Sequence, residues 1–245
     1  MRPDAALWAV VPAAGIGARI GGDRPKQYLA LAGQPVLQHS LNTLLALPNL
    51  RAVAVAIAAG DEAWPGLPAA LDSRVRLAPG GAERSDSVLS GLDCLASEAA
   101  AHDWVLVHDA ARPCLPTADL ERLVDSLAED DVGGILALPV ADTVKRADDA
   151  GRIIETVDRS GLWLAQTPQL FRYGMLAAAL RAAKAAGHAV TDEASAIERA
   201  GFQPRLVPGS PRNIKVTRPA DLALAENYLQ ADLVAAVSGF SGESE

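Results

Sequence analysis

Short apolar or β-branched runs alternate along the chain with longer stretches, rich in alanine and leucine, that have a helical period. The apolar runs predict β-strands at residues 7–11, 52–58, 75–78, 104–108, 134–139, 202–207 and 214–217. The longer stretches predict helices at residues 36–47, 85–101, 120–128, 175–186, 193–200 and 221–233. Strands that alternate with helices are typical of α/β proteins, so we expect a Rossmann-like, mostly parallel sheet with helices on both faces.

One segment interrupts this alternation. Residues 141–158, "ADTVKRADDAGRIIETVD", hold two short β-like runs on either side of the turn signal "DDAG". The pattern predicts a projecting β-hairpin arm. Because an isolated hairpin is only marginally stable in water, the arm must contact its own domain or another subunit.

The size of the chain allows one large domain or two small ones. It has 245 residues, of which 50% are hydrophobic, so a well-buried core is possible. No internal repeat is visible, and we favour a single domain over residues 1–236. The last residues, 237–245, are small and polar, and we expect them to form a disordered tail.

The charge balance argues against a nucleic-acid partner. The formal net charge is −8, whereas nucleic-acid-binding surfaces are strongly basic. A local cluster of cations, Arg19, Arg24 and Lys26, could still bind a small anion. The two cysteines, Cys94 and Cys114, lie far apart and are expected to be reduced and buried.

Two apolar segments could suggest a membrane location, but neither fits one. Asp4 and Pro12 interrupt the N-terminal stretch too early for a signal peptide, and we expect a strand there. Residues 27–50 carry no Asp, Glu, Lys or Arg, yet Gly33 and Pro35 disfavour a membrane span. We therefore expect a cytoplasmic protein that does not contact the membrane.

A glycine-rich loop follows the first predicted strand. In residues 10–28, "VVPAAGIGARIGGDRPKQY", this loop can present backbone N–H groups to a phosphate. Gly15 and Gly17 are followed by Ile20 where a dinucleotide-binding fingerprint needs glycine. The ATP-type phosphate loop also fails, because the nearby lysine, Lys26, follows a proline. The remaining pattern suits phosphates that are approached by backbone donors and by mobile cations.

Further motifs extend this pattern along nearly the whole chain. They are "GGAERSDSV" (80–88), "VLVHDAARP" (105–113), "DTVKR" (142–146), "TVDRSGLW" (156–163), "TPQLF" (167–171), "TDEAS" (191–195) and "NIKVTRPADL" (213–222). Together with the opening loop, they resemble the nucleotidyltransferases that activate sugars and polyols. The resemblance is greatest to the cytidylyltransferases of the 2-C-methyl-D-erythritol 4-phosphate pathway, and it implies a nucleotidyltransferase-type fold that dimerises through the 141–158 arm.

The resemblance implies a specific reaction in isoprenoid precursor biosynthesis. The phosphate monoester of 2-C-methyl-D-erythritol 4-phosphate attacks the α-phosphorus of CTP, and pyrophosphate leaves. The product is 4-diphosphocytidyl-2-C-methyl-D-erythritol. No general base is needed, because a phosphate monoester, with a second pKa of about 6, is already an anion near neutral pH. Catalysis then depends on positioning and positive charge, with Mg²⁺ or another divalent cation bridging the phosphates.

The resemblance also assigns roles to residues. Arg19 and Lys26 would bind the CTP phosphates, and Lys215 would lie beside the α-phosphate. The implied CTP-binding residues are Ala13, Ala14, Gly15, Gly17, Gly81, Ala82, Ser87 and Asp109. The implied substrate-binding residues are Asp109, Ala110, Thr143, Arg159, Thr167 and Lys215, with Arg159 also counted among the catalytic cations. Where this chain has Ala82, family members often have an acidic residue, so a contact there would have to come from the backbone.

Local arguments leave structural alternatives for some of these residues. Asp109 follows the predicted strand 104–108, at the edge where open α/β sheets bind ligands, and would contact the substrate or a metal. Asp109 could instead cap the next turn. Ser87 could simply belong to the first turn of its helix. Thr143 and Arg159 could be exposed hairpin residues. His108 is expected to pack in the core, and "TDEAS" is expected to cap a helix through Thr191 or Asp192.

Three other functions remain to be weighed. Within the same class, the acceptor could be another polyol phosphate, such as ribitol 5-phosphate. An NAD-dependent oxidoreductase is disfavoured by Ile20. A catalytically silent binding protein is disfavoured by the joint presence of Arg19, Lys26, Asp109, Arg159 and Lys215.

Overall fold

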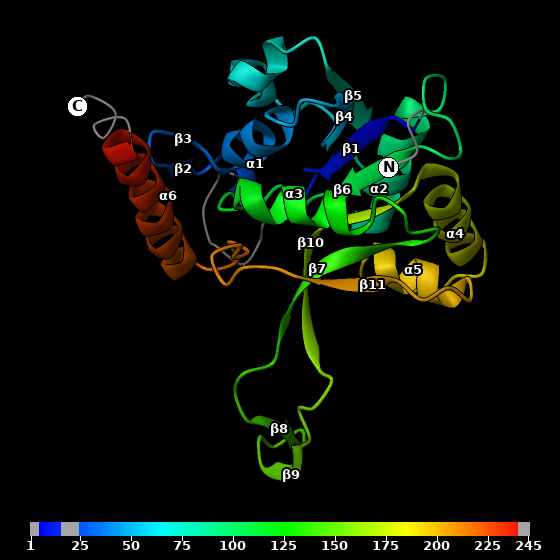
Figure 1. Ribbon diagram of the computed structural model, residues 1–245, viewed down its shortest axis with the longest axis vertical. Helices are drawn as coiled ribbons and strands as arrows, with labels where there is room; N and C mark the ends of the chain where they lie inside the picture. Colours follow the sequence, from blue (N-terminus) through cyan, green and yellow to red (C-terminus); the bar gives the residue numbers. More distant parts are fainter. Residues whose placement is uncertain (1–4, 16–24, 240–245) are drawn as a thin grey trace.

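A computed structural model describes residues 5–15 and 25–239 of the chain, and its centre is one twisted sheet (Figure 1). Within these residues the sheet has seven strands in the order β11-β7-β10-β6-β1-β4-β5. They are β1 (Leu7–Pro12), β4 (Leu50–Ile57), β5 (Val75–Pro79), β6 (Trp104–Val107), β7 (Gly133–Pro139), β10 (Trp163–Arg172) and β11 (Arg205–Pro208). β10 runs antiparallel to its neighbours β6 and β7, whereas the other pairs are parallel. The predicted mostly parallel sheet is confirmed.

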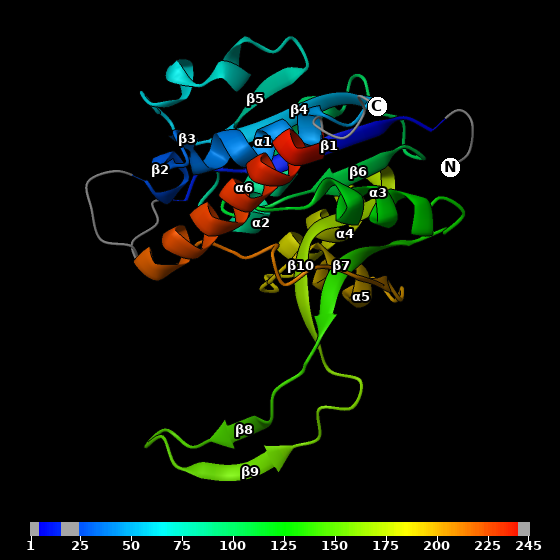
Figure 2. The same cartoon turned by 60° about the vertical axis from the view of Figure 1, so that its left-hand side comes forward.

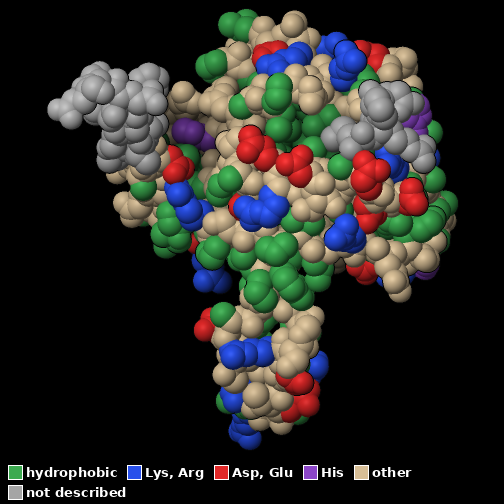
Figure 3. Space-filling view, in the orientation of Figure 1, with side chains coloured by type: hydrophobic (Ala, Val, Ile, Leu, Met, Phe, Trp, Pro, Cys, Tyr) green, Lys and Arg blue, Asp and Glu red, His purple; other side chains and the backbone are tan. Residues whose placement is uncertain are grey.

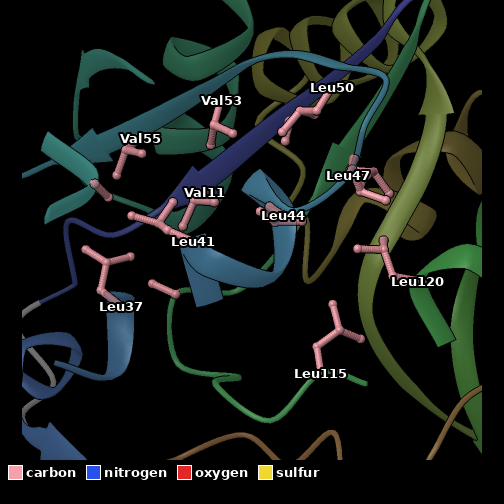
Figure 4. Close-up of a cluster of buried hydrophobic side chains, with 14 of the residues drawn as sticks. Val11, Leu37, Leu41, Leu44, Leu47, Leu50, Val53, Val55, Leu115 and Leu120 are labelled. Carbon is pink, nitrogen blue, oxygen red and sulfur yellow. The ribbon is translucent and has the colours of Figure 1, made fainter. Parts of the chain in front are cut away.

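Helices cover both faces of the sheet, as the sequence predicts. α1 (Val36–Leu45) and α3 (Thr117–Ser126) pack on one face, and α2 (Arg84–Leu95), α4 (Tyr173–Ala185) and α5 (Glu193–Arg199) pack on the other. Successive residues of β1 alternate between the two cores, because side chains along a strand point to opposite faces. Figure 4 shows the first core, where Val11, Val53 and Val55 of the sheet lie near Leu41 of α1.

A third, smaller cluster attaches α6 (Pro219–Gly239) to the body. Val216 and Ala225 are buried there with Leu31 and Cys114. Leu31 belongs to a small ladder of β2 (Ala30–Leu31) and β3 (Gln34–Pro35). Short 3₁₀ helices form at η1 (Lys26–Tyr28), η2 (Trp64–Gly66) and η3 (Pro68–Leu71). No helix in the described residues has the length and apolar character required to cross a membrane.

The predicted hairpin arm is confirmed, and it projects from the body (Figures 1 and 2). Its strands, β8 (Val144–Ala147) and β9 (Ile153–Val157), pair in antiparallel register. In the turn, the Gly151 N–H donates to the Asp148 carbonyl over 3.0 Å. Gly151 has a φ of +75°, which an L-residue adopts at a cost. The "DDAG" signal therefore locates the turn correctly.

One strand prediction was wrong, and one strand was missed. Residues 214–217 form no strand, because they lie between α6 and the loop after β6, where the Val216 N–H donates to the Ala111 carbonyl. β10 was missed altogether. Its sequence contains Pro168, which cannot donate to a ladder and normally argues against a central strand. The structure accommodates this proline with an irregularity in the β7 ladder between Ala165 and Gln169.

Some predicted boundaries also need correction. The helix predicted at 85–101 ends at Leu95, and beyond it the Asp103 carboxylate accepts a hydrogen bond from the Ala100 N–H in a turn. The strand predicted at 202–207 begins only at Arg205. A tail was predicted from residue 237, but α6 continues to Gly239; residues 240–245 lie outside the described part of the chain.

Candidate active site

A cavity of about 590 Å³ opens at the carboxyl ends of β1, β4 and β6. This is the edge where open α/β sheets bind ligands. Six separate parts of the chain contribute to it: the loop after β1, η1, Ala58 after β4, the start of α2 with the loop before it, the loop after β6, and Lys215. The predicted site residues that line it are Ala13, Ala14, Gly15, Lys26, Gly81, Ala82, Ser87, Asp109, Ala110 and Lys215.

Other predicted site residues lie elsewhere. Thr143 and Arg159 flank the two strands of the arm, are exposed, and do not line this cavity. Thr167 is buried next to Asp109. Gly17 and Arg19 lie outside the described residues, as does Arg24 of the predicted basic cluster.

Close backbone approach shapes the wall formed by Gly81 and α2. A Cβ atom on Gly81 would lie 2.2 Å from the Cβ atom of Asp86, so a larger residue would displace the loop. The Gly81 N–H donates to the Ser87 hydroxyl over 3.0 Å, and this hydroxyl donates to the Glu83 carbonyl over 3.3 Å. Ser87 therefore holds the loop that carries Gly81 and Ala82 at the cavity, while it also lines the cavity itself.

The wall on the β1 side is fixed from both directions. The Ala13 N–H donates to the Ala56 carbonyl over 2.7 Å, which continues the β1–β4 pairing. The Gln27 side-chain amide donates to the Ala13 carbonyl over 2.6 Å. This bond ties η1, and with it Lys26, to the loop after β1. The loop and Lys26 are thus held on the same side of the cavity.

A buried carboxylate surrounded by cations forms the charged centre of the site. Asp109 accepts from Arg84 Nε through Oδ1 over 2.9 Å and from Lys215 Nζ through Oδ2 over 2.8 Å. Arg112 Nε lies 3.8 Å from Oδ2. Burial alone would raise the pKa of Asp109, but Arg84 and Lys215 hold it well below its usual range. Asp109 is therefore ionised, and its two oxygens bond side chains from two other segments, Arg84 and Lys215.

The main chain around Asp109 is held by a buried polar chain. The Asp109 N–H donates to the Thr167 hydroxyl over 3.0 Å, and this hydroxyl lies 3.1 Å from His108 Nδ1. His108 Nε2 lies 3.2 Å from the Arg112 carbonyl. Burial lowers the pKa of His108 to about 4, so its ring is neutral and can donate from Nε2 and accept at Nδ1. His108 packs in the core as expected, and Thr167 holds the main chain of Asp109 through the hydrogen bond from its N–H.

Comparison with known proteins identifies the family. The model of the 2-C-methyl-D-erythritol 4-phosphate cytidylyltransferase family matches residues 7–231. The chain is 56% identical to the cytidylyltransferase of that name from Ectopseudomonas mendocina (strain ymp), over 92% of this chain and 97% of that protein. It is 58% identical to the one from Pseudomonas putida (strain W619), over 89% and 93%.

A solved structure agrees with the sequence comparison. The Francisella tularensis 2-C-methyl-D-erythritol 4-phosphate cytidylyltransferase superimposes with a TM-score of 0.79 at 35% identity, over 91% of this chain and 100% of that one. The chain belongs to the 2-C-methyl-D-erythritol 4-phosphate cytidylyltransferase family. This assignment confirms the resemblance deduced from the motifs, and it removes the oxidoreductase hypothesis.

The structure brings three further charged residues to the site of this cytidylyltransferase family member, and sequence reasoning missed all three. Arg84, in "GGAERSDSV", lines the cavity and bonds to Asp109, and Arg112, in "VLVHDAARP", lies beside the same carboxylate. Glu193 bonds to Arg84. Its motif was interpreted only as a helix cap, and Asp192 does cap α5 by accepting from the Ser195 N–H over 3.0 Å. All three residues stand inside recognised motifs, but no local pattern indicated that Arg84, Arg112 and Glu193 meet near Asp109.

Proposed function

We infer that the chain transfers a cytidylyl group from CTP to 2-C-methyl-D-erythritol 4-phosphate and releases pyrophosphate, a step of isoprenoid precursor biosynthesis. Membership of the family over residues 7–231 supports this inference. The observation that carries it chemically is the cavity itself, where Lys26 and Lys215 lie with the loop after β1 at the carboxyl edge of the sheet. Two cations and a loop of backbone donors are what a triphosphate requires.

The chemistry follows from charge and position. An oxygen of the acceptor's phosphate monoester attacks the α-phosphorus of CTP, and the bond from that phosphorus to the oxygen bridging to the β-phosphate breaks. No residue needs to remove a proton, because the attacking phosphate is ionised at neutral pH. Negative charge develops on the leaving pyrophosphate. In our proposal Lys26 and Arg19 stabilise that charge, and Lys215 stabilises the α-phosphate.

We propose that Mg²⁺, or another divalent cation, accompanies the CTP phosphates, with Asp109 as the nearby carboxylate. Mg²⁺ is commonly held by one or two carboxylates together with substrate phosphates. Asp109 lines the cavity, but its two oxygens already bond Arg84 and Lys215, so the ion would be held mainly by the CTP phosphates. In the described residues no group of three or more His, Cys, Asp or Glu side chains could form a metal cage by itself. When bound, the ion would neutralise phosphate charge.

Cytosine recognition is assigned to the walls of the same cavity. Ala13, Ala14, Gly15, Gly81 and Ala82 offer backbone groups but short side chains. The base would therefore be selected mainly by backbone hydrogen bonds and by the shape of the cavity. Since Ala82 has no polar side-chain atom, its contribution would come from its backbone.

We propose that the enzyme is a homodimer in which the arm of one subunit completes the site of the other. Arg159 and Thr143, placed by the arm outside their own subunit's cavity, would then hold the phosphate of the polyol. The arm exposes large apolar side chains, with Ile153 66% and Ile154 61% exposed. Figure 3 also shows hydrophobic side chains gathered where the arm joins the body. Exposed apolar surface of this kind marks an interface.

A pyrophosphate-release assay tests the function. It crosses the four ribonucleoside triphosphates with 2-C-methyl-D-erythritol 4-phosphate and ribitol 5-phosphate, each with and without Mg²⁺. We expect magnesium-dependent release with CTP and the methylerythritol phosphate, and weaker release with ribitol 5-phosphate. Absence of release from every pair would refute the transferase, and a preference for ribitol 5-phosphate would reassign the acceptor.

We place the enzyme in the cytoplasm, which fractionation would test.

A further inference from the structure

A line of charged side chains runs from α5 through α2 to the cavity, beyond the residues that the reaction itself requires. Glu193, the first residue of α5, has no solvent exposure. Its carboxylate oxygens accept from Arg84 Nη1 over 2.6 Å and Nη2 over 3.0 Å. The third nitrogen of Arg84, Nε, donates to Asp109. A single guanidinium therefore joins two buried carboxylates.

The end of this line that lies away from the cavity, Glu193 at the start of α5, is firmly anchored. The Ala194 N–H donates to the Gln169 side-chain carbonyl over 2.8 Å, and the Gln169 amide donates to Asp192 over 2.9 Å. Gln169 belongs to β10, in the middle of the sheet, and is itself buried. The first turn of α5 is thus fixed to the sheet on both sides of Glu193. Glu193 has little freedom to follow Arg84, so it determines where the guanidinium lies.

At the near end, two cations share one carboxylate. Arg84 occupies Oδ1 of Asp109, and Lys215 occupies Oδ2. Burial alone would lower the pKa of Arg84, but Glu193 and Asp109 raise it above its usual range. Without Arg84 the carboxylate could turn both oxygens toward Lys215 and Arg112. Lys215, which already bonds Oδ2, would then move with the turned carboxylate, and its position relative to a phosphate in the cavity would change.

We propose that Glu193 and Arg84 are positioning residues of the transferase, which set the orientation of Asp109 and, through it, the position of Lys215. This proposal rests on the proposed function of the site. A buried ion pair is weak evidence of a contribution to stability, since apolar side chains can often replace it without loss. Placing a cation beside reacting atoms is a different requirement, because a displacement of about 1 Å from a distant mutation can reduce the rate about 100-fold.

Two variants test the proposal. Glu193→Gln keeps the shape of the side chain but removes its charge. The double variant Arg84→Gln, Glu193→Gln removes both charges together, so that neither is left buried alone. The matched control is Asp93→Asn, Arg181→Gln, which removes an ion pair that also starts from α2 but has both side chains 54% exposed. For the wild type and each variant, kcat and the KM for CTP are measured. Each kcat is normalised to the folded fraction, which is determined by thermal unfolding.

We expect kcat of both test variants to fall about 10- to 100-fold, with the KM for CTP changed less than about threefold, because position matters most in the transition state. The control should keep wild-type values. A wild-type kcat in Glu193→Gln, a loss explained by the folded fraction, or a higher KM at unchanged kcat would overturn the proposal. If the double variant does not fold, Glu193→Gln decides by the same criteria. An inactive wild type would instead refute the transferase function.

Discussion

A mixed dimer of two inactive variants tests whether the arm completes the site of its partner. Lys26 lines the cavity of the body, whereas Arg159 directly follows the arm and does not line it. Lys26→Ala and Arg159→Ala should each lower kcat, since loss of one preorganised charge costs about 10²–10³-fold, or about 2.7–4 kcal/mol. Each homodimer should therefore keep about 0.1–1% of wild-type activity.

The geometry of a two-fold dimer fixes the expected recovery. In a mixed dimer with shared sites, one site receives both defects and the other receives neither. Random equal mixing makes about half of the dimers mixed, so roughly a quarter of all sites should work. Activity should thus rise about 25- to 250-fold over either single variant when the two are refolded together.

The assay is pyrophosphate release, with subunit exchange confirmed by native mass spectrometry. The control mixes Lys26→Ala with Lys215→Ala. Because both lysines line the cavity of one body, every site in that mixed dimer keeps one defect, and no recovery is expected. If the Lys26 and Arg159 variants exchange subunits but activity stays at the single-variant level, the arm serves its own subunit and the shared-site proposal is refuted.

Three further predictions concern stability, pH and metal. Leu44→Ala, in the fully buried core of Figure 4, should lower the free energy of unfolding measured in urea by about 2–5 kcal/mol. Leu71→Ala, at a residue that is 88% exposed, should change it by less than about 0.5 kcal/mol, and equal losses would contradict the assigned core. His108 has its pKa lowered from 6.5 to about 4, so below pH 6.5 the unfolded chain binds the proton first, and stability should fall as the pH drops from 6.5 to 4, by about 3 kcal/mol in total. Urea titrations across that range should show a shallower decline for His108→Gln, and parallel curves would rule out this source. Chelation by EDTA should abolish pyrophosphate release, leave the far-ultraviolet circular dichroism unchanged, and be reversed by added Mg²⁺; full activity in EDTA would remove the metal from the mechanism.

Much of the fold followed from local periodicity. The burial of α1 on one face of the sheet, for example, is visible in the spacing of Leu37, Leu41 and Leu44. Strand β10 could not be predicted in this way, because Pro168 argues against a strand. Pro168 lies where the β7 register is interrupted, between Ala165 and Gln169, and the residues on either side pair with β6 and β7. Residues 214–217 gave the opposite error: an apolar run looks the same whether it is buried by a sheet or by a helix such as α6.

The sequence by itself determined the family, the alternation of strands and helices, the glycine-rich loop and the hairpin turn, because each depends on residues close together in the chain. Only the tertiary structure decided which charges meet. Arg84 bonds to Glu193, 109 residues away, and Asp109 bonds to Lys215 in the wall of the cavity. Such pairs are brought together by the order of the strands and by the packing of α2 and α5 on one face, which no local pattern specifies. The ionisation of Asp109 and the placing of Lys215 are thus properties of the folded chain, because burial and neighbouring charges exist only once these segments have packed.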